Sequence, residues 1–288
     1  MGSVGEALEL FIQSLELTQR QREEVSRQHT MVREALRKRL GHKTDFLSGS
    51  YSRNTAIRPL HDIDIFLVLD DSNPTPQASP DTVLKRIRQA LKDEWREKEL
   101  PILQQHSVHL EFTKSGLEFD VVPAYQLPGR EVYLIPERQT GKWLHTNPRV
   151  HQDLSTLANE RAGKKLKPLI KAVKHWSRHQ GSNPLGSFHL EAMSYDAFPR
   201  PPEGYLEGLE LLFTYLSQRV MRPCPDPARL GADVDALMKN GQREAAHNLL
   251  KGAARTVRLA LEERTSRPEQ AHARLRAFFG NDYRDRRR

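Results

Sequence analysis

The sequence has almost no cysteine and no long apolar run over its 288 residues. Its one cysteine, Cys224, excludes an internal disulfide bond and a thiolate zinc cluster, and this usage is typical of a reducing compartment. Mean hydropathy is −0.68, and no apolar stretch is long enough to span a bilayer. The first residues, MGSVGEALELF, lack the basic segment that opens a secretory signal. We therefore expect a cytoplasmic protein with no membrane partner.

Acidic side chains are also fewer than basic ones, 37 against 45, which gives a formal net charge of +8. A basic protein of this size favours anionic partners. Nucleoside triphosphates, nucleic acid and anionic membranes all satisfy that description. The choice among them rests on motifs rather than on charge.

Apolar periodicity predicts an α+β (mixed α/β) first lobe over residues 1–160. A long amino-terminal helix is predicted from about Glu6 to Leu40, and a second helix from about 81 to 98. Alternating apolar residues predict strands at 61–69, 108–112 and 117–122. The last two strands flank Lys114, Ser115 and Gly116 and form a hairpin pattern. We expect a mixed sheet backed by helices.

The second lobe, residues 161–288, is predicted to be helical. Its helix candidates are 164–180, 187–198, 204–220, 233–239 and 241–264. The ligand site is expected in the cleft between the two lobes.

Two carboxylates two residues apart dominate the informative stretch Gly49–Asp64, GSYSRNTAIRPLHDID. On a strand, Asp62 and Asp64 project to one side while Ile63 and Ile65 enter the core. Carboxylates this close repel each other unless a cation neutralises them. Magnesium is the natural cation for a site built from carboxylate and phosphate oxygens.

A third carboxylate, Asp120, lies on the polar side of the strand LEFDVV. If the two strands are neighbours, Asp120 joins Asp62 and Asp64, and three carboxylates can hold two metal ions roughly 3.5–4 Å apart. One ion would activate an attacking hydroxyl and the other would neutralise the leaving pyrophosphate. We expect two Mg²⁺ ions, with Mn²⁺ as a substitute.

Gly49 and Ser50 precede this strand as a short turn. Gly49 has no Cβ and lets the backbone approach a phosphate, while Ser50 adds a hydroxyl and an N–H at the same place. Each of these signals alone is common in proteins without catalytic sites. Their order along the chain makes the combination specific.

The combination resembles the polymerase-β-like nucleotidyltransferase superfamily. It is most similar to the bacterial cyclic-oligonucleotide synthases (CD-NTases), relatives of cyclic GMP–AMP synthase and oligoadenylate synthetase. Further segments that resemble this family are GKWLHTNPRVH (141–151), LKPLIKAVKHW (166–176), SFHLE (187–191) and FFGNDY (278–283). The resemblance covers nearly the whole chain.

The resemblance also assigns nucleotide-binding residues. Lys174 is expected to reach the triphosphate with Lys171 as a helper, Ser187 to bind phosphate, and Phe188 to stack on the nucleobase. Periodicity alone places both lysines on the polar face of an amphipathic helix and Phe188 on an apolar face.

By the same resemblance, the chain is a templateless synthase that makes a cyclic di- or trinucleotide, such as cyclic triadenylate, from nucleoside triphosphates. ATP is the expected substrate, pyrophosphate is released, and the biology is antiphage signalling (CBASS). Some family members require a HORMA-type regulatory partner. Direct activation by nucleic acid is not favoured, because one cysteine does not support the zinc-bearing insertion of the animal DNA sensor.

Two alternatives stay open on the sequence alone. A linear oligoadenylate-forming or RNA-tailing nucleotidyltransferase would use the same acids. A degenerate member that binds nucleotide without turnover is the second, and the intact acidic trio argues against it.

Overall fold

The computed structural model describes residues 3–60, 62–70, 76–97, 99–113, 115–181 and 183–285. The chain folds into two compact units. The sheet unit comprises Leu17–Asn54 and Pro59–Gln152. The helical unit comprises Met1–Glu16, Thr55–Arg58 and Asp153–Arg288. The amino-terminal residues therefore group with the carboxy-terminal half, whereas they were predicted to belong to the first lobe.

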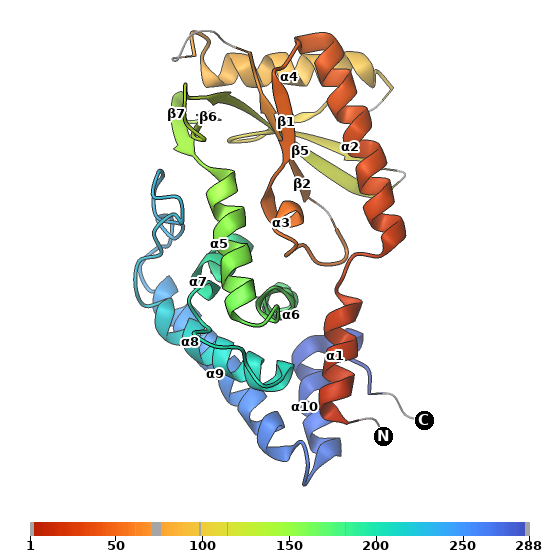
Figure 1. The fold of residues 1–288 in the computed structure, drawn as a ribbon, viewed down its shortest axis with the longest axis vertical. Helices are drawn as coiled ribbons and strands as arrows, with labels where there is room; N and C mark the ends of the chain where they lie inside the picture. The colour runs from red at the N-terminus through yellow and green to blue at the C-terminus, as the bar shows by residue number, and fades with distance from the viewer. Residues whose placement is uncertain are drawn as a thin grey trace. The chain divides into compact units, whose positions relative to one another are not determined.

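The sheet unit contains a seven-stranded mixed sheet within its described residues (Figure 1). Its strands are β1 (Thr44–Leu47), β2 (Asp62–Val68), β3 (Ile102–Leu103), β4 (Val108–Phe112), β5 (Leu117–Gln126), β6 (Tyr133–Glu137) and β7 (Lys142–Thr146). Its helices are α2 (Gln19–Leu40), α3 (Gly49–Ser52) and α4 (Pro80–Glu94). The strand order is β1-β2-β5-β4-β3, with β6 joining β5 to β7. Only β2 and β5 pair in parallel among these ladders, and the mixed-sheet prediction is confirmed.

The two faces of the sheet differ in chemistry because strand side chains alternate. Ile63, Ile65 and Leu67 of β2 are fully buried on one face. Helix α4 packs on this face, where Val83 meets Tyr125 of β5. Helix α2 in turn contacts α4. The other face is therefore left to the even-numbered residues of β2 and β5, among which are the acids.

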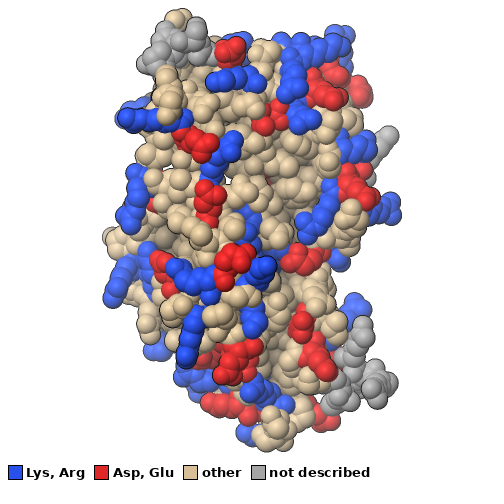
Figure 2. Space-filling model, in the orientation of Figure 1, with Lys and Arg blue, Asp and Glu red and all other residues tan. Residues whose placement is uncertain are grey.

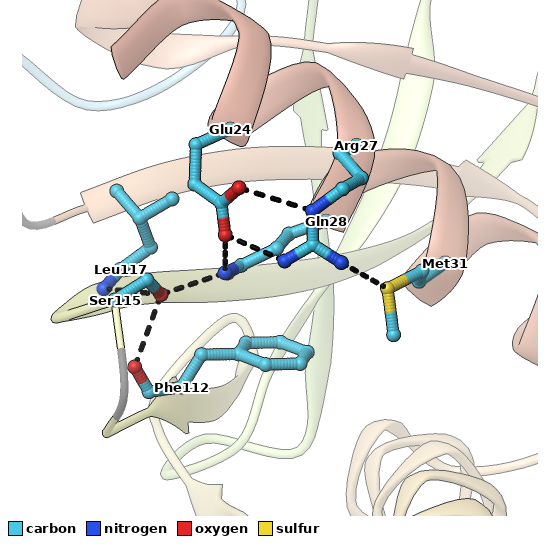
Figure 3. A network of polar contacts seen from close by, with 7 residues as sticks. All are labelled: Glu24, Arg27, Gln28, Met31, Phe112, Ser115 and Leu117. Carbon is cyan, nitrogen blue, oxygen red and sulfur yellow. Dashed lines mark hydrogen bonds and ion pairs between the residues drawn. The ribbon is translucent and has the colours of Figure 1, made fainter. Parts of the chain in front are cut away.

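The β4–β5 hairpin is held to α2 by a polar network (Figure 3). The Gln28 side-chain amide donates to Ser115 Oγ at 2.7 Å and to Glu24 at 2.5 Å. Ser115 Oγ donates to the carbonyl oxygen of Phe112 and accepts from the N–H of Leu117. These bonds fix the turn that sets the register of β5, the strand that carries Asp120.

The helical unit surrounds one apolar core. Its described elements are α1 (Val4–Ser14), α6 (Leu166–Arg178), α7 (Ser187–Ser194), α8 (Tyr205–Arg219), α9 (Gln242–Glu263), α10 (Pro268–Phe279) and the 3₁₀ turn η1 (Gly280–Asp282). Helix α5 (Pro148–Arg161) contains the boundary between the units, after Gln152. Leu8 and Phe11 of α1 pack in the same core as Leu169 of α6 and Phe279 of α10. Helix α1 is thus an integral part of this unit.

The prediction of one long amino-terminal helix is wrong, because the structure has two helices there, α1 and α2. Ser3 and Glu6 form a capping box that starts α1, and Thr18 and Gln21 form another that starts α2. A Thr followed three residues later by Gln is a helix-start signal. The signal was present in the sequence within an otherwise continuous helical pattern.

The predicted helix at 233–239 is also wrong. The structure has successive turns there, with N–H to carbonyl bonds from Ala236 to Asp233 and from Met238 to Asp235. The N–H of Val234 instead bonds the carbonyl of Cys224 at 2.7 Å. So short a segment gains little from helix formation, and long-range bonds decide its conformation.

No helix among the described ranges combines the length and the apolarity needed to cross a bilayer. Three residues with a predicted place in a strand, a helix and a hairpin turn lie outside the described residues, namely His61, Lys98 and Lys114.

Candidate active site

The three predicted acids lie on one face of the sheet. Strand β2 pairs in parallel with β5, which sets Asp64 opposite Asp120 and Asp62 opposite Glu118. Residues opposite each other across a ladder project to the same side of the sheet. The register therefore brings Asp62, Asp64 and Asp120 to one face, through a pairing between segments far apart in the chain.

The same face becomes apolar further along the two strands. Phe66 and Val68 of β2 form a buried cluster with Val122 and Ala124 of β5 and with Tyr133 of β6. Asp62 and Asp64 occupy the start of β2, where Asp62 is exposed and Asp64 is half-buried. One side of the acidic group is thus bounded by hydrocarbon, which lowers the local dielectric and strengthens interactions between charges.

Gly49 lies against the Asp64 carboxylate. Its φ is +64°, and a Cβ placed on it would lie 1.7 Å from Oδ2 of Asp64. The N–H of Ser48 donates to the main-chain oxygen of Asp64 at 2.8 Å. The half-buried Ser50 follows within α3, which lies beside β2 (Figure 1). Only glycine therefore allows the turn to approach this acid so closely.

The charges around Asp64 are unfavourable in the absence of a cation. Burial, and then the neighbouring charge of Asp120, raise the pKa of Asp64 to about 6. Asp62 adds to the increase, while the buried Arg53 opposes it. A divalent cation that replaces the proton on such a buried carboxylate stabilises it. The donor set of carboxylate oxygens fits Mg²⁺.

Asp120 has a partner, His109, that was not among the residues predicted from the sequence. His109 Nδ1 donates to Asp120 Oδ1 at 3.0 Å, and its Nε2 lies 3.7 Å from Glu118. Burial raises the pKa of Asp120, and the His109 hydrogen bond offsets only part of that increase. His109 lies directly opposite Asp120 in the β4–β5 hairpin. The hairpin was predicted, so extending its pairing by three residues on each strand would have located His109.

A pH dependence of stability follows from Asp64. Its pKa in the folded protein, about 6, exceeds the ordinary value of 3.8, so the folded state holds the proton more tightly. The stabilisation is complete below pH 3.8 and is lost as the pH rises through 6. In chelator at pH 7.5, Asp64→Asn should therefore be about 2–3 kcal/mol more stable to unfolding than wild type. Urea unfolding of both proteins at pH 4.5 and 7.5 measures this, and an equal difference at both pH values would contradict it.

In the helical unit, the structure places Lys174 in a buried polar network. Its Nζ donates to the carbonyl of Thr55 at 3.0 Å and lies 3.9 Å from Glu191, which is fully buried. The Thr55 hydroxyl and the Tyr195 hydroxyl also donate to the Glu191 carboxylate. Lys174 therefore neutralises a buried acid and holds the Thr55–Arg58 segment.

Lys171 is buried as well, 1% exposed, and its Nζ lies 2.5 Å from Glu16 Oε1. Both lysines lie on the polar face of α6, as the spacing predicted, but the structure buries that face at these two positions. Helical spacing locates a polar face correctly but does not reveal that acids from distant segments cover it.

Lys174 should accordingly contribute strongly to stability. We expect Lys174→Met to lower the free energy of unfolding by about 3–5 kcal/mol, because the Glu191 charge stays buried without its cation. Adding Glu191→Gln should recover part of the loss, since it removes the unpaired charge. Urea unfolding of the two single variants and the double variant tests this, and strictly additive losses would contradict it.

Ser187 and Phe188 begin α7. Ser187 is exposed at the first helical position after Gly186, where helix N–H groups are free to meet an anion. Phe188 is half-buried and lines a pocket of about 400 Å³ together with Pro184, His189 and Met238. His189 is 4% exposed, and its Nε2 has no hydrogen-bond partner among the described residues. The pocket thus offers an aromatic side chain to a ligand.

The basic side chains do not gather at one place on the face shown in Figure 2. Lys and Arg lie among Asp and Glu over that whole face. The basic side chains on this face are therefore dispersed, and the net charge of +8 does not by itself mark a binding surface there.

Comparison with known proteins identifies the family. A family model described as Second Messenger Oligonucleotide or Dinucleotide Synthetase domain (SMODS) matches residues 2–159, more than half of the chain. A cyclic AMP-AMP-AMP synthase of Acinetobacter sp. is 34% identical over 190 residues, which are 62% of this chain and 52% of that relative. The match thus spans about half the length of the Acinetobacter protein.

Solved structures share the fold. Escherichia coli MS115-1 CdnC, solved with ATP, has a TM-score of 0.78 at 19% identity and covers 98% of this chain and 99% of its own. The same CdnC in complex with HORMA-deltaN has a TM-score of 0.75 at 19% identity, covering 98% of each chain. Vibrio cholerae DncV cyclic AMP-GMP synthase, solved with a linear intermediate, has a TM-score of 0.76 at 14% identity and covers 94% of this chain and 93% of its own. With its SMODS domain and this fold, the chain belongs to the CD-NTase family of cyclic-oligonucleotide synthases.

Proposed function

We propose that the chain condenses nucleoside triphosphates, with ATP as substrate, into a cyclic di- or trinucleotide such as cyclic triadenylate, releasing pyrophosphate. The observation that carries this is the register of β2 on β5, which brings Asp62, Asp64 and Asp120 to one face. The similarity to the cyclic AMP-AMP-AMP synthase of Acinetobacter and the ATP bound to CdnC support the choice of adenine nucleotides.

We propose that Asp62, Asp64 and Asp120 hold two Mg²⁺ ions, for which Mn²⁺ can substitute. The raised pKa of Asp64 and the glycine that leaves its carboxylate accessible support this assignment. Bound there, the ions would lower the pKa of the attacking hydroxyl and neutralise charge on the departing pyrophosphate.

The chain's own groups have separate tasks in this proposal. Asp120 accepts the proton of the attacking hydroxyl, and the hydrogen bond from His109 keeps that carboxylate ionised and oriented. Gly49 and Ser50 present main-chain N–H groups to the phosphates. His109 thus acts as a positioning residue through Asp120.

We further propose that the helical unit binds the nucleotide, as predicted for residues 161–288. Ser187 binds phosphate at the start of α7, and Phe188 stacks on the base, which its pocket supports. Lys174 and Lys171 are assigned to the triphosphate by the resemblance alone. Each already contacts an oxygen of the protein, so binding phosphate requires an exchange of partner.

The biological setting is proposed from the relatives. CdnC was solved in complex with HORMA-deltaN, and a HORMA-type regulatory protein is the partner we propose for this chain. Antiphage signalling through a cyclic product, in the cytoplasm, completes the proposal.

The test is product analysis of all four nucleoside triphosphates incubated with the protein and Mg²⁺, with Mn²⁺ in parallel and with or without a HORMA protein. Mass spectrometry should find a cyclic adenylate that survives phosphatase. Products that lose all terminal label to phosphatase would establish the linear alternative. Absence of pyrophosphate release under every condition would favour the inactive nucleotide-binding alternative.

A further inference from the structure

A second group of metal-ligating side chains lies in the helical unit. His175 and His179 are one turn apart on α6, and Asp282 belongs to η1. One ligand atom from each lies within 4.8 Å of those from the other two. Two imidazoles and one carboxylate suit Zn²⁺ and similar transition metals, unlike the all-oxygen group on the sheet.

His179 is oriented as a ligand. Its Nδ1 lies 2.8 Å from the carbonyl oxygen of His175, and because a carbonyl only accepts, Nδ1 carries the proton. The neutral ring therefore has its lone pair on Nε2. A main-chain carbonyl bound to the second ring nitrogen is the usual means of fixing a metal-binding histidine.

His175 is the fixed member of the group. Its ring is 4% exposed and meets the edge of Phe11, with ring centroids 5.2 Å apart. Its Nε2 lies 3.0 Å from the carbonyl of Phe279 and 3.6 Å from Oδ2 of Asp282. The Asp282 side chain is 65% exposed, so it can move towards the ring without disturbing the core.

We propose that His175, His179 and Asp282 bind one Zn²⁺-type ion, with water in the remaining position, and that the ion fastens η1 to α6. Zn–N and Zn–O bonds of about 2.0–2.2 Å require ligand atoms roughly 3.4 Å apart, so the group, whose atoms lie within 4.8 Å of one another, must contract. The exposed His179 and Asp282 provide this contraction. His175 exchanges its hydrogen bond to Phe279 for the metal and changes tautomer.

The consequence is a metal-dependent attachment of the carboxy-terminal segment. Helix α10 leads directly into η1, and α6 is the helix that carries Lys171 and Lys174. An ion bound by the folded protein alone stabilises it in proportion to its occupancy. The site thus acts on the stability of the helical unit and does not rest on the proposed synthase activity.

The experiment uses tag-free, full-length protein carrying Asp62→Asn and Asp64→Asn, which removes the other candidate metal site. Titration with ZnCl₂ by calorimetry should show about one ion per chain. A Zn²⁺ concentration about 100-fold above the Kd should raise the Tm of the protein by about 5 °C, whereas Mg²⁺ should not change the Tm. Substitution by Co²⁺ should give the visible absorption of a nitrogen- and oxygen-ligated ion.

Two ligand variants and one matched control make the assignment specific. In the same background, His179→Ala and Asp282→Asn should each weaken Zn²⁺ binding by at least about 10-fold and remove the Tm shift. His145→Ala, which deletes an exposed histidine of β7, should change neither. Zn²⁺ binding that is absent, or that is unaffected by both ligand variants, would overturn the proposal.

Discussion

Protein carrying Asp62→Asn and Asp64→Asn should release pyrophosphate from ATP at least about 10³-fold more slowly than wild type. The substitutions keep the shape of the side chains and remove the charges that we propose to hold a divalent cation. Wild-type activity should disappear in chelator and return with Mg²⁺ or Mn²⁺, whereas the double variant should not respond. Pyrophosphate release measured with both ions is the appropriate assay.

The loss should occur without loss of folding. Because burial and the charge of Asp120 raise the pKa of Asp64, a neutral amide at this position should stabilise the metal-free protein at neutral pH. A Tm equal to or above that of wild type therefore accompanies the inactive variant. Asp153→Asn, an exposed acid of α5, is the matched control and should leave activity unchanged. Unaltered pyrophosphate release by the double variant would remove the acidic site from the mechanism.

Gly49→Ala should be the second most damaging substitution. The added Cβ would lie 1.7 Å from Asp64 Oδ2 and 2.7 Å from its Cγ, so either the turn or the carboxylate must move. A displacement of about 1 Å in such a group costs on the order of 10²-fold in rate. The positive φ of 64° adds strain of about 1–3 kcal/mol for a residue with a side chain.

Gly41→Ala separates these two effects. Gly41 has the same conformation, φ +65°, at the end of α2, but a Cβ there would meet nothing within 4 Å. Gly41→Ala should therefore lose a similar amount of stability and keep its activity. Urea unfolding and initial rates of both variants make the comparison. Equal activity losses in the two would show that backbone strain, and not contact with Asp64, accounts for the effect.

Much of the sheet unit could be predicted from local pattern. Alternation along HDIDIFLVL places Ile63, Ile65 and Leu67 together, and all three are fully buried. The same alternation places Asp62 and Asp64 on the other side of the strand from these apolar residues. The hairpin between β4 and β5 was predicted too, and its register contained His109. Such features depend on neighbours in sequence, which the period of a strand relates directly.

The helical unit was predicted less well because its partners are distant. Helical spacing placed Lys171 and Lys174 on the polar face of α6. Their burial depends on Glu16, Thr55 and Glu191, which come from three other segments. Spacing within one helix contains no information about what covers it, so the burial of these two lysines could not be predicted.

By itself, the sequence determined which residues are the candidates for the chemistry: two acids on one side of a strand, a third on another strand, and a glycine before them. Only the tertiary structure decided that β2 lies in parallel beside β5, with Asp64 opposite Asp120, and that Gly49 contacts the Asp64 carboxylate. Parallel pairing joins segments separated by a long connection, and its register follows from the packing of both faces of the sheet. Local periodicity fixes the direction of a side chain, but long-range packing fixes what it meets.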